Sequence, residues 1–163
     1  MTHTPVHQAP SKSLMIGSYL LAIIFDAILI ASPYLHWLPP ITLLTVIYWS
    51  SENLSQTFIP SAFILGLLYD TLTQTLLGMH ALLFCLILFL ILRFRLNFRL
   101  FTPIQQALTL IPFLYLYQGL LWFLNPQPYQ PQTLILGLLF PLTLLLLWPI
   151  LSLSLQMLSK KVD

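Results

Sequence analysis

The sequence predicts an all-α membrane protein that folds as a bundle of six transmembrane helices. Of its 163 residues, 58% are hydrophobic and 6% are charged, whereas a soluble domain carries about 25% charged residues. Six apolar segments follow one another along the chain, and they leave no room for a second, soluble domain. The net charge of +2 is too small to indicate nucleic-acid binding.

The limits of the six helices follow from the need for about 20 apolar residues per crossing. The second helix is the hardest to place, because Pro39 and Pro40 interrupt it, so it must begin near Pro33 or be partly re-entrant. Pro141 and Pro149 predict kinks in the last helix. The expected helices are near 14–32, 34–50, 58–77, 79–94, 103–124 and 132–158.

The basic residues predict the orientation. They lie ahead of the first helix, around the link between the fourth and fifth, and after the last: Lys12, Arg93, Arg95, Arg99, Lys160 and Lys161. Six crossings place all of them on one side, as the positive-inside rule requires of a protein with both ends in the cytoplasm. We therefore expect cytoplasmic tails at 1–13 and 159–163 around a transmembrane domain at 14–158.

Aromatic and arginine side chains fit the expected boundaries of the membrane. Trp37 and Trp122 fall at the outer boundary, and Trp49 and Trp148 fall nearer the inner one, as in aromatic belts. The cytoplasmic basic loop of Arg93, Arg95 and Arg99 has two interpretations. It sets the topology, which we favour, or it binds anionic lipid headgroups or an acidic cytoplasmic partner.

Asp70 lies in the middle of the third apolar segment, where a carboxylate costs about 2.5–3.5 kcal/mol on insertion scales. Small and polar residues recur every fourth position around it, so they share one helix face and allow another helix to approach closely. We expect another helix to satisfy Asp70, with Asp26 and Gln118 as candidates, and the adjacent Tyr69 is a further possible partner. Asp26 lies at the same expected depth, so the two carboxylates could share a proton. The stripe consists of Ala62, Gly66, Asp70 and Gln74, with Gly78 following.

No motif in the sequence predicts an enzyme, a metal site or a cofactor. Tyr69-Asp70 resembles the Tyr-Asp pair of intramembrane aspartyl proteases, but Asp26 lacks the Gly-x-Gly-Asp context of their second aspartate. His-Glu-x-x-His and Gly-x-Ser-x-Gly are absent from the chain. His36 and His80 have no metal-ligand spacing, and we interpret them as boundary residues near the outer face.

Three segments together resemble one protein family. Gly66-Leu-Leu-Tyr-Asp70, with Gly78 eight residues later and an apolar helix after it, resembles the central signature of MreD, the rod shape-determining membrane proteins. Ile41–Trp49 resembles the Leu-rich helix that ends in Tyr-Trp in that family, and Gln105-Gln106-Ala107-Leu108 resembles the start of its fifth helix. Many members carry a glycine four residues after the aspartate, where this chain has Gln74.

The resemblance implies a non-enzymatic scaffold of the cell-wall elongation complex in the bacterial cytoplasmic membrane. Its expected partners are an MreC-like scaffold protein and, through it, RodA, its partner transpeptidase and MreB, together with membrane lipids. The stripe around Asp70 either lines a groove for the partner's membrane helix or packs inside the bundle. The family is also similar in fold to the substrate-binding subunits of energy-coupling-factor vitamin transporters, and such a subunit is the alternative function.

Overall fold

The computed structural model describes residues 12–32, 38–53, 56–124 and 139–162, with side chains up to residue 159. All regular secondary structure in these ranges is helical, which confirms the all-α part of the prediction. The elements are α1 (Lys12–Ala31), α2 (Ile41–Glu52), α3 (Ile59–Thr73), α4 (Met79–Arg93), α5 (Arg95–Leu100), α6 (Pro103–Leu124), the 3₁₀ turn η1 (Phe140–Thr143) and α8 (Leu144–Val162).

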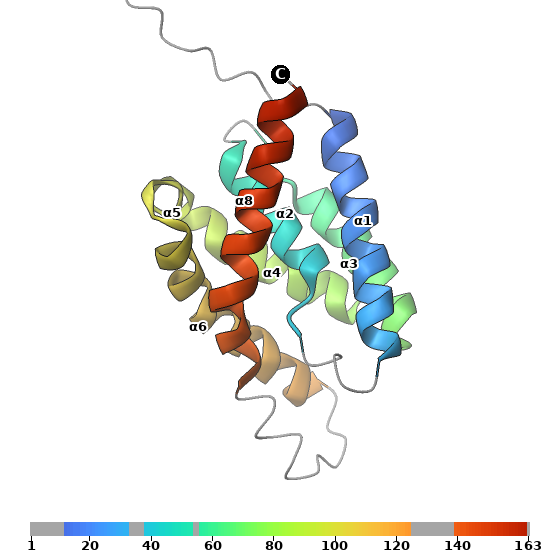
Figure 1. Cartoon of the computed structure of the whole chain (residues 1–163). Helices are drawn as coiled ribbons and strands as arrows, with labels where there is room; N and C mark the ends of the chain where they lie inside the picture. Colours follow the sequence, from blue (N-terminus) through green and yellow to red (C-terminus); the bar gives the residue numbers. More distant parts are fainter. Residues whose placement is uncertain (1–11, 33–37, 54–55, 125–138, 163) are drawn as a thin grey trace, which may run out of the picture.

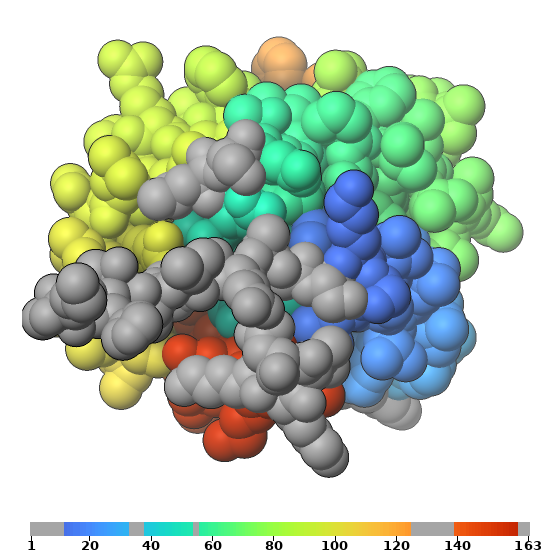
Figure 2. Space-filling view, turned by 90° about the horizontal axis from the view of Figure 1, so that it is seen from above, coloured from blue at the N-terminus to red at the C-terminus, as the bar shows by residue number. Residues whose placement is uncertain are grey.

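The long helices run alternately up and down the bundle, so that α1 starts and α8 ends at the same end (Figure 1). Figure 2 views this end, with α1 and the region of α5 on opposite sides of the molecule. The alternation fits a chain whose basic residues all lie at one end. The opposite end is formed by the end of α1, the start of α2, the α3–α4 turn, the end of α6 and η1 (Figure 1).

Three helices are long and apolar enough to cross a membrane, namely Lys12–Ala31, Pro103–Leu124 and Phe140–Ser159. The helices α3 and α4 are apolar but have only 15 residues each, and α2 has 12. Since an α-helix rises about 1.5 Å per residue, α2 is much shorter than the hydrocarbon core of about 30 Å. The number of six crossings therefore stays a prediction.

The helix limits differ from the expected ones at three places. The second helix begins at Ile41, directly after Pro39 and Pro40, rather than near residue 34. The third ends at Thr73 rather than 77, because Gln74 adopts the left-handed conformation, with φ at 53°. The expected link after α4 contains the short helix α5.

The last helix also departs from a regular α-helix where prolines occur. Pro141 lies in the 3₁₀ turn η1, and Pro149 lies inside α8, where its ring leaves one backbone carbonyl without its usual donor. The helix continues to Val162, four residues past the expected limit, and residues 132–138 of the expected span lie outside the described ranges.

Two tryptophans expected at the inner boundary lie in the core instead. Trp49 is 1% exposed and Trp148 is fully buried, so both side chains pack inside the protein rather than against lipid, while their position near the inner boundary stays a prediction. The indole N–H of Trp49 donates to Ser18 Oγ over 2.8 Å, and that of Trp148 donates to Gln106 Oε1 over 2.9 Å. These bonds connect α1 with α2 and α6 with α8. Trp37 lies outside the described residues.

Candidate functional site

The Asp70 carboxylate is buried at the end of α3 and accepts four hydrogen bonds from the segment that starts α4. The backbone N–H of Gly78 donates to Oδ2 over 2.7 Å, and that of His80 donates to Oδ1 over 2.8 Å. The Nδ1 of His80 lies 2.8 Å from Oδ1, and the Thr75 hydroxyl donates to the same oxygen over 3.2 Å. The first N–H groups of a helix have no partner within it, so the carboxylate caps α4 and interacts favourably with its dipole.

Asp70 is thus satisfied by another helix, as expected, but not by the candidates named from the sequence. His80 is the side-chain partner; it lies in the first turn of α4, at the end of the bundle opposite to the basic residues, and it is only 4% exposed. Asp26 binds elsewhere, and neither Gln118 nor the Tyr69 hydroxyl bonds to Asp70. His80 lies ten residues after Asp70, a separation for which the sequence shows no helical periodicity.

The close packing of α3 on α4 depends on Gly66. A Cβ atom added there would collide with Ala81 Cα and lie 2.7 Å from the backbone N of Ala81. Ala62, one turn earlier on the same face, is fully buried. The small residues of the stripe therefore let the backbones of α3 and α4 approach each other, as small-residue faces do in membrane helices.

Gln74 and Gly78 do not continue the helical stripe. Gln74 is exposed and follows the last residue of α3 with φ at 53°, so its side chain leaves the face shared by Ala62, Gly66 and Asp70. Gly78 precedes α4 with φ at 98°, a conformation that costs little only for glycine. The two residues shape the turn that brings the start of α4 onto the Asp70 carboxylate.

Asp26 makes a similar arrangement between α1 and α2. Its two carboxylate oxygens accept the backbone N–H groups of Ile41 and Thr42, each over 2.9 Å. The Thr42 hydroxyl adds a bond of 2.6 Å, and Asp26 is 2% exposed. Instead of sharing a proton with Asp70, each aspartate caps the helix that follows its own. A threonine two residues after Pro40, at the start of an apolar helix, was the available signal for this contact.

Two of the three arginines of the basic loop bind the end of α2. Arg95 donates to the backbone carbonyl oxygens of Ser50, Asn53 and Gln56, over 3.5, 3.4 and 3.1 Å. Arg99 lies 3.9 Å from Glu52, and Arg93 is exposed. Cations at a helix C-terminus interact favourably with its dipole, so the loop stabilises α2 as well as carrying positive charge.

A groove of about 450 Å³ lies between α1 and α8, with α2 at its base. Its α1 side carries the small residues Gly17 and Ser18, and its α8 side carries Ser154. A Cβ atom added at Gly17 would meet nothing within 4 Å, in contrast to Gly66. The rest of the lining is mainly apolar, and both flanking helices are among those long enough to cross a membrane.

In the part of the chain that the structure describes, no three histidine, cysteine or acidic side chains gather as a metal site would require. Cys85 is half-buried in α4, and its thiol lies 3.7 Å from the carbonyl oxygen of Ile59. The polar groups of the Asp70 cluster bond mainly to one another, which is the arrangement of a structural cap.

Taken together, the fold and the buried caps define a helical membrane protein whose polar centres hold helices together. The family model of the rod shape-determining protein MreD matches residues 11–158. The chain belongs to the MreD family, and it is a rod shape-determining membrane protein. No curated protein and no solved structure matches it.

Proposed function

We propose that the protein is a non-enzymatic scaffold of the rod complex and that the groove between α1 and α8 binds the membrane helix of an MreC-like partner. The observation that carries the proposal is the groove of about 450 Å³ that Gly17 lines, where an added Cβ atom meets nothing within 4 Å. Most apolar side chains on the outside of a membrane protein face lipid, so exposure alone does not indicate a partner. A concave, mainly apolar surface with small residues on both sides is suited to a second helix.

The stripe around Asp70 is less suited to this contact. Ala62, Gly66 and Asp70 face α4 within the bundle and leave no space for a partner's helix. In this proposal the stripe has a packing role, because it fixes the α3–α4 hairpin as one wall of the bundle. Gln74 and Gly78 shape the turn of that hairpin, and the arginines of the basic loop anchor α5 to the end of α2.

The scaffold would act by positioning. The partner's helix would lie in the groove, and through that partner the protein would be connected to RodA, its partner transpeptidase and MreB. The membership of the MreD family supports this role. The proposal includes six crossings of the bacterial cytoplasmic membrane with both ends in the cytoplasm, supported by the alternating helix directions and the position of the basic residues.

The test fills the groove without disturbing the bundle. Gly17→Leu places a branched side chain where the protein has open space, so the variant should fold as the wild type does. Gly119→Leu on α6 is the matched control, because a Cβ atom there also meets nothing within 4 Å and the site lies outside the groove. Both variants would be expressed with the host's MreC-like protein and purified through an affinity tag.

We expect Gly17→Leu to lose at least about tenfold of the co-purified partner, equivalent to about 1.4 kcal/mol, while Gly119→Leu retains it. In a host depleted of the wild-type protein, Gly119→Leu should restore rods and Gly17→Leu should leave round cells. Full partner recovery and rod shape with Gly17→Leu would exclude the groove as the binding surface. A depletion that produces a vitamin requirement without a change of shape would favour the transporter alternative.

A further inference from the structure

A second concave surface lies at the end of the bundle opposite to the basic residues. It is a cavity of about 320 Å³, formed by the end of α1, the start of α2, the α3–α4 turn, the end of α6 and η1. This volume is at the lower end of the range for small-molecule sites, which is about 300–1,000 Å³. Its lining includes Tyr69, His80, Tyr117, Gln118, Trp122 and Phe140.

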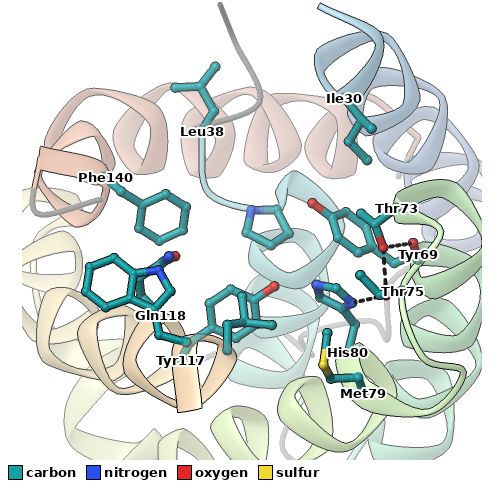
Figure 3. A pocket seen from close by; sticks show the side chains of 13 residues that line it. Ile30, Leu38, Tyr69, Thr73, Thr75, Met79, His80, Tyr117, Gln118 and Phe140 are labelled. Atoms are coloured by element: carbon teal, nitrogen blue, oxygen red, sulfur yellow. Dashed lines mark hydrogen bonds between the residues drawn. The ribbon is translucent and has the colours of Figure 1, made fainter. Parts of the chain in front are cut away.

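Two tyrosine hydroxyl groups that form no hydrogen bond within the described ranges point into this cavity. Tyr117 is only 2% exposed, yet its hydroxyl has no hydrogen-bond partner within the described ranges. The Tyr69 hydroxyl also has no hydrogen-bond partner within the described ranges, and Tyr69 is 8% exposed. Figure 3 shows both hydroxyl groups and the His80 ring directed toward the interior of the cavity. Both hydroxyls open onto the cavity and can donate to or accept from a ligand there.

The charges around the cavity are unfavourable for an anionic ligand. Among the described residues no lysine or arginine lines it, and two buried acids lie nearby, Asp70 behind His80 and Asp26 at the start of α2. A phosphate or a carboxylate would find no cation here and would lie close to a buried carboxylate. With Nδ1 bonded to Asp70, the Nε2 atom of His80 remains for a bond to the ligand.

The remaining surface of the cavity is aromatic. The rings of Tyr69 and His80 lie with centroids 4.9 Å apart, and those of His80 and Tyr117 lie 6.3 Å apart. Phe140 lies across the cavity from His80, and the Gln118 amide supplies both a donor and an acceptor (Figure 3). Trp122 also lines the cavity. Hydroxyl, amide and imidazole groups between aromatic walls fit a ligand that has hydroxyl groups at its edge and C–H groups on its faces.

We propose that this cavity binds a neutral, hydroxyl-rich group of the size of one sugar ring, presented either as the headgroup of a lipid or as a free sugar. The ring faces would lie against the aromatic walls. The hydroxyl groups of the ligand would bond to the hydroxyls of Tyr69 and Tyr117, to Nε2 of His80 and to the Gln118 amide. Both sources present the same chemistry to the protein, and the experiment separates them.

The experiment uses the full-length protein in phosphatidylcholine nanodiscs and three probes. Glucose represents the free sugar, monoglucosyl diacylglycerol represents the lipid-borne sugar, and diacylglycerol is the same lipid without the sugar. Binding is followed by the fluorescence of Trp122, checked with Trp122→Phe, and by native mass spectrometry. We expect saturable binding of at least one sugar-bearing probe and none of diacylglycerol. Preference for the glucolipid identifies a headgroup site, and equal affinity for glucose identifies a free-sugar site.

Tyr117→Phe removes one hydroxyl and retains the ring, so it should weaken binding about five- to tenfold, the effect of one buried hydrogen bond. Tyr48→Phe is the matched control, because Tyr48 is also buried but does not line the cavity. Gln118→Leu is a second test with a side chain of similar length. The proposal is overturned if no sugar-bearing probe binds, if diacylglycerol binds as well, or if Tyr48→Phe weakens binding as much as Tyr117→Phe. Because this site is separate from the groove, its failure would leave the scaffold proposal intact.

Discussion

The α1–α2 and α3–α4 connections both satisfy the free N–H groups at the start of their second helix, but they differ in how closely the helices pack. In each pair a buried aspartate near the end of the first helix caps the start of the second, with Asp26 accepting from Ile41 and Thr42 and Asp70 accepting from Gly78 and His80. Inside a membrane no water is present to satisfy the free N–H groups of a helix start. A carboxylate from the preceding helix does so, and the cost of burying it is offset by the charged hydrogen bonds.

The two connections differ in what surrounds the cap. Asp70 also binds the His80 ring, and the α3 and α4 backbones touch at Gly66. Asp26 has no ring partner, and on the same helix Gly17 faces open space. The α3–α4 hairpin is therefore fixed by its own contacts, whereas α1 keeps one small-residue surface unfilled. The comparison indicates that an aspartate cap by itself does not determine how closely its helix packs on its neighbours.

The largest expected effect comes from removing the Asp70 carboxylate. Asp70→Leu leaves the buried His80 ring N–H and two backbone N–H groups without an acceptor, and we expect the free energy of unfolding to fall by about 3–5 kcal/mol. Asp26→Leu leaves one side-chain donor and two backbone donors, and it should cost less. Unfolding by sodium dodecyl sulfate, followed by tryptophan fluorescence, measures both. An equal or greater loss with Asp26→Leu would contradict the difference between the two connections.

The next effect tests the close contact of α3 with α4. Gly66→Ala should lower the free energy of unfolding by about 1–3 kcal/mol, since the new Cβ atom forces the helices apart at Ala81. Gly17→Ala meets nothing and should raise it by up to about 1 kcal/mol through higher helix propensity. The same titration measures the two variants side by side. If both variants changed stability in the same direction, the close contact at Gly66 would not be what holds α3 against α4.

The smallest effect concerns the end of α3. Gln74 holds a left-handed conformation that costs a residue with a side chain about 1–2 kcal/mol, so Gln74→Gly should raise the free energy of unfolding by about 1 kcal/mol. Gln74→Ala retains the same strain and should change it little. The glycine that many members of the MreD family carry at this place fits the same conformation. A similar stability of the glycine and alanine variants, measured by thermal unfolding in detergent, would show that the backbone is not strained here.

Local properties of the sequence determined several features of the protein by themselves. The hydrophobic segments predicted helices close to the observed α1, α4 and α6, because length and apolarity decide whether a helix forms in a membrane. The four-residue spacing of Ala62, Gly66 and Asp70 predicted a shared face that lies against another helix, since spacing alone fixes the faces of a helix. The order of the motifs predicted the MreD family, which the family match confirms.

Only the tertiary structure decided which groups meet across helices. The partners His80 of Asp70 and Thr42 of Asp26, and the burial of Trp49 and Trp148, depend on how helices lie beside one another. Helix α5 formed where the sequence indicated a link, since Phe98 is buried against Trp148. A helix face can be found from spacing alone, but its contacts come from residues distant in the chain. For the same reason, the groove at Gly17 and the tight contact at Gly66 look alike in sequence and differ only in the folded bundle.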